Sequence, residues 1–323
     1  MSDAAFFDAL VSVENAWLAV LVEHGLAPAS AATDLSVLVE EGDAQAVAAA
    51  AEGDGNPVTG LVALLRTRVS GDVAQWMHRG LTSQDVVDTA LMLCLRDALD
   101  AVAGQLHAQV RVLADMVRAH RDAPLLTRTL TQPALPGTAG MKFAVWLGGV
   151  LDAADTLECV PPPAVQAGGA AGTMAAVTEL SGSPDVALAL PPALATKLGL
   201  APALPWHTSR SRVTRAGDAL VTCCDSWGHI ANDAAVGARA EIGEFAEGSG
   251  GGSSTMPHKS NPVLTVLLRR AALTAAPLAA TLHAASAASL DERSDGGWHA
   301  EWAAMRTLAR QTVVAGAHDL SSR

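Results

Sequence analysis

Apolar residues recur every three to four positions along most of the chain, which is the period of a helix with one buried face. The first such run covers residues 3–26 and ends at Gly25 and Pro28. Two shorter runs follow at 34–51 and 57–70, and the stretch EGDGNP between them indicates a turn. These segments predict a small N-terminal helical region.

Three longer runs predict long helices near residues 82–119, 208–246 and 260–288. The first of them spans roughly 35 residues, or about 50 Å of helix. Helices this long in soluble proteins usually belong to extended bundles. Further helices are expected near 138–160 and 185–199. No run alternates apolar and polar residues with the period of a strand, so the pattern predicts an all-α fold.

The same pattern divides the chain into three parts. We expect an N-terminal helical domain at residues 1–80 and a central long-helix bundle at 81–288. Residues 289–323 then form a C-terminal helical segment whose last helix reaches about His318. We interpret this last part as a short or truncated C-terminal domain.

Composition supports the helical prediction and restricts the partners. Half of the 323 residues are hydrophobic, while aromatic residues make up only 3% and tyrosine is absent, which disfavours an all-β fold. The formal charge of −12 argues against non-specific binding of nucleic acid. A few focused arginines can still hold a small anionic substrate.

Cysteine usage and the N-terminal sequence predict a cytoplasmic location. The four cysteines form no CxxC pair, and the N-terminus has no basic region of a signal peptide. The most apolar long run, residues 271–290, is rich in alanine. A buried bundle helix explains this run better than a membrane span, so we expect no membrane partner.

The stretch GSGGGSSTMPHKSNP, residues 248–262, is the most distinctive loop of the chain. Its glycine run excludes a stable helix or strand, so we predict a loop that presents hydroxyls, backbone amides and Lys259. The apolar period resumes after Pro262, which places the loop beside a helix N-terminus, where an anion is favoured. By composition alone, a solvated glycine linker explains the stretch equally well.

Four short polar clusters lie at the ends of long helices or in the breaks between them, at residues 82–85, 128–132, 206–212 and 253–261. Two of them carry arginines, which grip carboxylates with two parallel hydrogen bonds. The first also has the capping-box spacing, a hydroxyl followed three residues later by an acid. Together the clusters predict a site for a small polycarboxylate.

Other site types lack their signals. The ten histidines show no HxxxH or HExxH spacing, and the sequence has no P-loop or dinucleotide fingerprint. The serine of a Ser-His-Asp hydrolase would need a strand-to-helix elbow, and none is predicted. We therefore expect no metal and no cofactor.

Several stretches resemble signatures of the fumarase/aspartase superfamily. GSSTMPHKSNP at 252–262 resembles its signature loop, LTSQDVVDTA at 81–90 its first signature region, and QAGGAAGTMA at 166–175 its second. The stretches WHTSRSR at 206–212 and DERSDGGWHAEW at 291–302 look most like those of its 3-carboxy-cis,cis-muconate cycloisomerase branch. The resemblance covers about residues 3–318 and implies the long-helix bundle of that superfamily.

The resemblance also implies a homotetramer in which each active site is built from three subunits. It implies that Ser253 is the general acid or base, while Lys259 and Asn261 hold the carboxylate that becomes an aci-carboxylate. Thr82 and Ser83 would bind a substrate carboxylate at a helix start. The other residues that we expect to contact the substrate are Gln84, His78, Arg128, Gln132, His207, Arg210, Ser254, Met256 and Arg293.

Several of these residues also fit a purely structural role. His78 and His207 fit packed, hydrogen-bonded histidines as well as ligand contacts. Arg293 fits an exposed ion pair as well as a carboxylate-binding group. Thr82 and Asp85 fit a helix cap, and capping is compatible with binding.

Leu130 separates two classes of reaction. Amine lyases of the superfamily carry a histidine in an RTHGQ-like stretch that helps to protonate the leaving amine, and the similar stretch here reads RTLTQ. Leucine cannot transfer a proton, so an amine lyase would lose a factor of roughly 10²–10⁴ in rate. A muconate cycloisomerase does not need this group, because its lactone opens by releasing a carboxylate whose acid has a pKa of about 4.

We therefore favour a cofactor-free cycloisomerase that interconverts 3-carboxy-cis,cis-muconate and carboxymuconolactone. The alternatives are another superfamily lyase that eliminates fumarate from a substituted succinate, and a non-catalytic structural homo-oligomer. Two departures keep the substrate open. Ser211 lies where relatives often have an acid, and Ala167 replaces a bulkier residue.

Overall fold

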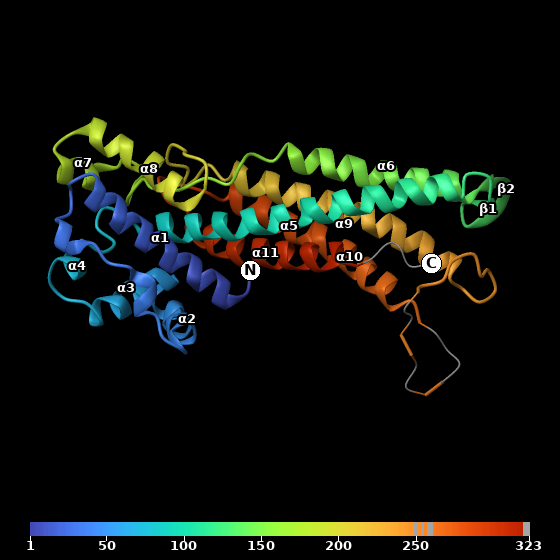
Figure 1. Cartoon of the computed structure of the whole chain (residues 1–323), viewed down its shortest axis with the longest axis horizontal. Helices are drawn as coiled ribbons and strands as arrows, with labels where there is room; N and C mark the ends of the chain where they lie inside the picture. Colours follow the sequence, from blue (N-terminus) through green and yellow to red (C-terminus); the bar gives the residue numbers. More distant parts are fainter. Residues whose placement is uncertain (249–250, 253–254, 257–260, 319–323) are drawn as a thin grey trace. The chain divides into compact units, whose positions relative to one another are not determined.

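The computed structural model describes residues 1–248, 251–252, 255–256 and 261–318, and Figure 1 shows the chain from its N-terminus in blue to its C-terminus in red. The described residues form eleven α-helices, two short 3₁₀ helices and one two-stranded sheet. The all-α long-helix prediction is therefore confirmed. The predicted site residues Ser253, Ser254 and Lys259 lie outside the described residues.

The chain folds into two compact units, and each is discontinuous in sequence. The first unit contains Met1–Asp97, Pro162–Arg212 and Ala284–Trp302. The second contains Ala98–Pro161, Val213–His283 and Ala303–Arg323. The domain boundaries expected at residues 80 and 288 stay predictions.

The first unit is built around α1. Its apolar stripe is buried at Trp17, Leu18 and Leu21, and α1 contacts α8. The elements of this unit are α1 (Asp3–Glu23), η1 (Ala29–Ala31), η2 (Leu35–Leu38), α2 (Asp43–Asp54), α3 (Pro57–Thr67), α4 (Gly71–Trp76), α7 (Ala175–Ser181), α8 (Pro184–Leu198) and the first turns of α5 (Ser83–Ala119) and α11 (Gly296–Gly316).

One N-terminal helix is shorter than its apolar pattern suggests. The pattern predicts a helix at 34–51, but η2 ends at Leu38 and α2 begins only at Asp43. Gly42 precedes α2 with φ of 93°, a left-handed conformation that interrupts the helix and that glycine adopts without strain.

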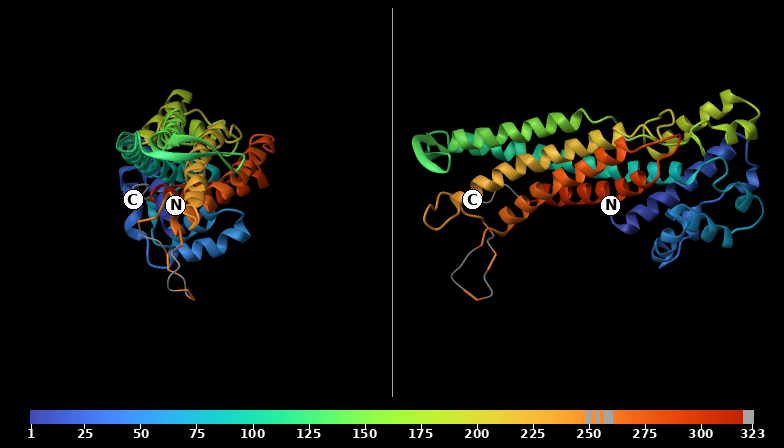
Figure 2. Two further views of the ribbon diagram at one scale, coloured as in Figure 1. Left: turned by 90° about the vertical axis from the view of Figure 1, so that its right-hand side faces the viewer. Right: turned by 180° about the vertical axis from the view of Figure 1, so that it is seen from behind.

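The second unit is a bundle of long helices with a β-hairpin at one end. It holds the rest of α5 and α11, with α6 (Ala139–Glu158), most of α9 (Ser211–Gly237) and most of α10 (Val263–Ala287). The hairpin, β1 (Pro124–Thr129) and β2 (Gln132–Thr138), joins α5 to α6, and the two helices run side by side in opposite directions (Figures 1 and 2). Rings of Phe143, Trp146 and Phe245 pack against one another in its core.

The hairpin is a correction, because the apolar pattern predicts no strand in the chain. Thr129 pairs with Gln132, so the turn consists of Leu130 and Thr131, with φ of 48° and 70°. Positive φ at both turn residues matches the two-residue hairpin geometry, but it strains a β-branched threonine. Prolines obscure the strand pattern here, and they are tolerated because both strands of a two-stranded sheet are edges.

Helix α9 is also a correction, because it ends at Gly237 rather than near residue 246. The chain turns back there, and the backbone N–H groups of Glu244 and Phe245 donate to the carbonyl of Gly237 at 2.9 and 3.2 Å. A Cβ at residue 237 would overlap the Phe245 ring. The apolar residues after Gly237 therefore belong to a packed turn.

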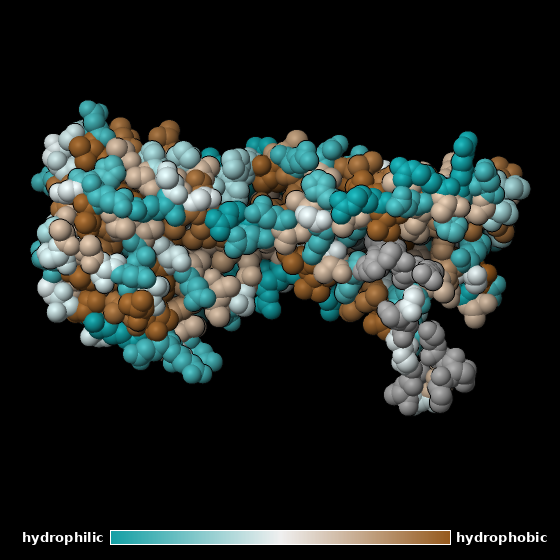
Figure 3. All heavy atoms as spheres, viewed as in Figure 1, coloured by the Kyte–Doolittle hydropathy of each residue, from teal (hydrophilic) through white to brown (hydrophobic). Residues whose placement is uncertain are grey.

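Two helices, α1 and α10, are long and apolar enough to cross a membrane by length and composition alone. Core helices of soluble proteins pass the same test, and 67% of the apolar window of α1 is buried, against 28% for α10. Exposed apolar residues on α10 include Val266 and Leu273. On the face shown in Figure 3, hydrophobic and hydrophilic side chains are mixed.

Candidate functional site

The start of α5 is tied to two distant segments through the buried carboxylate of Asp85. Its Oδ2 accepts hydrogen bonds from the backbone N–H groups of Thr82 and Gly169, both at 2.9 Å. Its Oδ1 accepts one from the N–H of Gly168 at 2.9 Å and lies 2.9 Å from Nε2 of His207. The bond to Thr82 is half of a capping box. Asp85 thereby joins the predicted helix cap, the second glycine-rich turn and the WHTSRSR stretch.

The backbone at Gly168 leaves no room for a side chain. A Cβ there would lie 2.7 Å from Cε1 of His207, 2.8 Å from Cβ of Pro205 and 3.0 Å from Cα of Gly172. Because a proline ring and a backbone atom cannot move aside easily, Gly168→Ala should destabilise the protein by about 1–3 kcal/mol in urea unfolding.

Gly104→Ala in α5 is the matched control for this substitution, because a Cβ there meets nothing within 4 Å. It should stabilise the protein by roughly 0.5–1 kcal/mol, since alanine is the better helix former. Equal midpoints for the two variants would show that the space around Gly168 is less rigid than the structure indicates.

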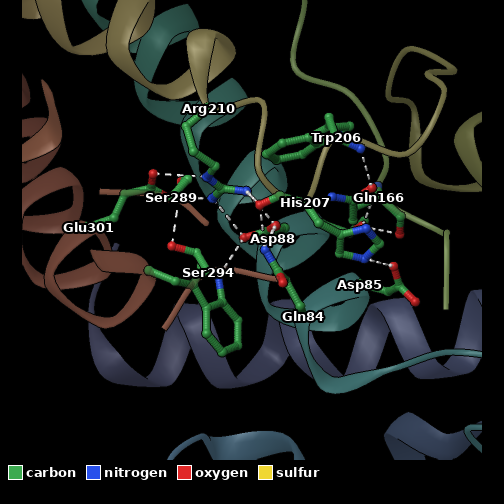
Figure 4. A network of polar contacts seen from close by, with 12 residues as sticks. Gln84, Asp85, Asp88, Gln166, Trp206, His207, Arg210, Ser289, Ser294 and Glu301 are labelled. Atoms are coloured by element: carbon green, nitrogen blue, oxygen red, sulfur yellow. Dashed lines mark hydrogen bonds and ion pairs between the residues drawn. The ribbon is translucent and has the colours of Figure 1, made fainter. Parts of the chain in front are cut away.

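Arg210 lies between two carboxylates at the start of α9, as Figure 4 shows. It donates two hydrogen bonds to Asp88, at 2.7 and 2.9 Å, and two to Glu301, one of them at 3.0 Å from Nε. Nη1 also donates to the backbone carbonyl of His207 at 3.3 Å. Burial by itself lowers the pKa of Arg210, but the two carboxylates raise it by more, so the guanidinium stays charged.

The residues around Arg210 are buried and paired. The indole N–H of Trp298 donates to Asp88 at 3.0 Å, and the amide of Gln84 donates to Asp88 and to the carbonyl of His207 at 3.2 and 2.8 Å. Arg210 makes one hydrogen bond for each of its five N–H groups. Direct contact of Arg210 with a substrate would require one of these bonds to break.

Four other predicted residues of the first unit, Thr82, Ser83, His78 and Arg293, are only half-buried. Nη1 of Arg293 donates to the hydroxyl of Thr82 at 2.9 Å, which places a cation beside the first turn of α5. Helix N-termini and cations both favour carboxylates. This group therefore has the chemistry of a carboxylate-binding site.

His78 has a charged partner that the sequence reasoning missed. Its Nδ1 lies 2.6 Å from Oε1 of Glu14, and the Glu14 side chain is fully buried on α1. Burial by itself lowers the pKa of the His78 imidazole, but the charge and hydrogen bond of Glu14 raise it by more, so the net pKa lies above its ordinary value. The available signal was an acid on the apolar stripe of the first helix.

The remaining described residues of the predicted site belong to the second unit. Arg128 makes two hydrogen bonds to Glu244, at 2.7 and 2.8 Å. Gln132 is exposed at the hairpin, beside the 96% exposed Leu130. Asn261 exchanges two backbone hydrogen bonds with Gly251, at 2.8 and 2.9 Å, which close the base of the glycine loop.

The N-terminus of α10 corrects one expectation. Its amide donors were expected to favour a substrate anion, but Glu247 already accepts from the N–H groups of Thr265 and Leu264, at 2.6 and 3.3 Å. The chain's own carboxylate therefore caps this helix. Met256, the other described residue of the loop's polar cluster, is 42% exposed.

A mostly apolar cavity of about 850 Å³ in the second unit is lined in part by Glu244 and Glu247, the partners of Arg128 and of the α10 N-terminus. Its lining includes Phe143, Trp146 and Phe245, and none of the predicted site residues. Across the part of the chain that the structure describes, no group of three or more metal-ligating side chains is found.

A family model described as a lyase matches residues 8–275. The chain belongs to this lyase family, within the fumarase/aspartase superfamily. The chain is 40% identical over 322 residues to nitrosuccinate lyase from Streptomyces davaonensis. This alignment covers 96% of the chain and 68% of that protein. The chain is 38% identical over 304 residues to 3-carboxy-cis,cis-muconate cycloisomerase from Bradyrhizobium diazoefficiens, covering 91% and 65% respectively.

A solved structure supports the same family. The lyase matches the crystal structure of 3-carboxy-cis,cis-muconate lactonizing enzyme from Pseudomonas putida with a TM-score of 0.84 at 33% identity, over 96% of this chain and 69% of that one. The lyase thus spans about two thirds of the length of these relatives.

Proposed function

We propose that the lyase is a cofactor-free cycloisomerase that interconverts 3-carboxy-cis,cis-muconate and carboxymuconolactone. Two observations carry the proposal. Leu130 disfavours amine-releasing substrates, and identity of 32–38% to 3-carboxy-cis,cis-muconate cycloisomerases of four bacteria favours the cycloisomerase. Leu130 lies at the tip of the hairpin and is 96% exposed. In the RTHGQ-like stretch of the amine lyases, the residue at the matching position is a proton-donating histidine. A carboxylate leaving group needs no such donor, because it is a weak base.

In the proposed reaction, a carboxylate of the substrate adds to a double bond of the same molecule. Ser253 delivers a proton to the adjacent carbon and is then reprotonated from solvent, so the ionised substrate takes up one proton. Counted as neutral acids, the substrate and the product are isomers. The negative charge that develops on the neighbouring carboxylate is held by Lys259 and Asn261, as preorganised donors stabilise charge in other active sites. The reaction requires neither a metal nor an organic cofactor, and we place it in the cytoplasm.

The proposed assembly is a homotetramer whose active sites combine residues from three chains. One support is membership of the fumarase/aspartase superfamily, for which the sequence resemblance implies sites shared among subunits. Another is the strained turn at Leu130 and Thr131, because strain of this kind gathers at functional sites. A third is the apolar surface that α10 leaves exposed in a single chain, which suits helix packing between copies.

A second candidate is a lyase acting on a substituted succinate, which the 40% identity to nitrosuccinate lyase favours. Elimination from nitrosuccinate would release nitrite, another weak base that leaves without a general acid. Leu130 therefore argues against amine-releasing substrates but fits both candidates.

An absorbance assay separates the two candidates. With 3-carboxy-cis,cis-muconate we expect loss of the conjugated-diene absorbance, and the product should have the mass of the substrate. Adenylosuccinate and argininosuccinate are the controls and should be inert, because their leaving groups are amines. Formation of fumarate from nitrosuccinate, with the muconate left unchanged, would replace the cycloisomerase with the second candidate.

A further inference from the structure

Glu14 is an unusual residue for its place in the fold. It lies on α1 beside Val13 and three residues before Trp17, and both neighbours are fully buried. A buried carboxylate is costly unless it is paired. Oε1 of Glu14 lies 2.6 Å from Nδ1 of His78, while Oε2 has no hydrogen-bond partner among the described residues. The fold therefore buries the Glu14 carboxyl group with His78 as its one hydrogen-bond partner among the described residues.

That contact fixes a histidine whose backbone is already held in an uncommon conformation. His78 has φ of 60°, in the left-handed region that few residues other than glycine adopt. The carbonyl before it, of Met77, accepts from Arg66 at 3.0 Å, and the carbonyl after it, of Arg79, accepts from the indole of Trp17 at 2.9 Å. Helices α1 and α3 therefore hold both flanks of His78, and Glu14 sets the direction of the ring.

The ring is well placed to meet a ligand. Its side chain is 20% exposed, and it precedes Thr82 by four residues, in the segment that leads into α5. Nδ1 is bonded to Glu14, and the other ring nitrogen, Nε2, makes no hydrogen bond to the described residues. Nε2 is therefore available to a ligand. A protonated imidazole donates from both nitrogens.

We infer that Glu14 is a positioning residue that keeps His78 as an imidazolium whose Nε2–H binds a carboxylate of the substrate at the start of α5. The inference rests on the proposed function for the identity of the substrate. It assigns His78 the role of a fixed cation, so Ser253 remains the group that transfers the proton. It also explains why an acid interrupts the apolar stripe of α1.

The charges around His78 support this role. Burial opposes the cation, Glu14 on α1 favours it most, Arg66 on α3 opposes it, and Asp85 on α5 favours it. Their sum raises the pKa of His78, so the imidazolium is stabilised at low pH and is lost as the pH rises through this raised pKa. Substrate binding should weaken over the same range, and the stability that the pair contributes should be lost there too.

The test is Glu14→Gln, which keeps the shape of the side chain and removes its charge. The pKa of His78 is measured by NMR of histidine-labelled lyase, with its signal assigned by its loss in His78→Gln. We expect the pKa of His78 to fall in Glu14→Gln. We also expect the KM for the muconate to rise about tenfold at a pH between the two measured pKa values, through the loss of one charge-assisted hydrogen bond. It should recover at a pH below both values, with little change in kcat.

Glu23→Gln is the matched control, because it makes the same substitution at an exposed position of the same helix, where Glu23 pairs with Lys197. It should leave both the titration and the KM unchanged. An unaltered His78 titration in Glu14→Gln, or a KM that rises equally at every pH, would overturn the inference. If Glu14→Gln does not fold, a pKa of His78 at or below about 6.5 in the unaltered lyase would overturn it as well.

Failure of the proposed function is a separate result. If the unaltered lyase does not consume the muconate, citrate serves as the polycarboxylate probe in calorimetric titrations. Weaker citrate binding by Glu14→Gln at a pH between the two measured pKa values, recovering below both, would then support the inference. Equal citrate binding by both proteins would reject it.

Discussion

Replacing Arg210 with methionine is expected to destabilise the lyase by about 3–5 kcal/mol, because it leaves two buried carboxylates without their cation. The side chains of Asp88 and Glu301 are 0% and 1% exposed, and each accepts two hydrogen bonds from Arg210. Methionine fills a similar volume but donates nothing. Chemical denaturation followed by circular dichroism measures the loss.

The control is Arg212→Met, two residues further along the chain in the first turn of α9, where the guanidinium donates to the carbonyl of Pro162 at an exposed site. Its cost should stay below about 1 kcal/mol. The destabilisation of Arg210→Met should also shrink at acid pH. Burial already raises the pKa of Glu301, and without Arg210, whose hydrogen bond and charge lower it, this carboxyl group would become neutral more readily. Equal destabilisation of the two variants would contradict the buried network.

Turnover should fall by roughly 10²–10⁴-fold in Ser253→Ala, because the methyl group cannot carry the proton on which the proposed reaction depends. Binding of a polycarboxylate should survive, since Thr82, Ser83 and Arg293 are untouched. The measurement is kcat for the muconate alongside calorimetric binding of citrate.

Ser254→Ala is the matched control in the same loop. The resemblance assigns proton transfer to Ser253 and substrate binding to Ser254. Ser254→Ala should therefore raise the KM more than it lowers kcat. A larger fall in kcat for Ser254→Ala than for Ser253→Ala would exchange the roles of the two serines. Full activity in both variants would remove the loop serines from the chemistry.

The long helices were predictable because their periodic apolar faces are local signals. The pattern places α5 at 82–119 and α10 at 260–288, and the structure begins and ends them within a few residues of these limits. The pattern failed where apolar residues serve a turn, as beyond Gly237, since packing of Phe245 against Gly237 is not a periodic signal. It failed at the hairpin because proline masked the strands.

The site was predictable only where its residues are sequence neighbours. The spacing of Thr82 and Asp85 identified the helix cap, and the structure shows the expected bond from the Thr82 N–H. The partners Glu14, Glu301 and Glu247 were missed, because an acid in a helix or loop gives no sign of what it will meet after folding. Whether such a side chain is buried against a cation or an amide depends on contacts over many residues of separation.

The discontinuity of the first unit has a consequence for synthesis. Its segments end at Asp97, Arg212 and Trp302. Glu301 is therefore synthesised long after α1 and Asp88, although it shares the contacts of Arg210 with Asp88. At about 5–20 residues per second, the ribosome needs roughly 10–40 s to travel from the first of these segment ends to the last. Throughout that interval Asp88, and later Arg210, lack the Glu301 carboxylate that completes their cluster. The nascent chain is thus expected to bind chaperones until the segment Ala284–Trp302 has emerged.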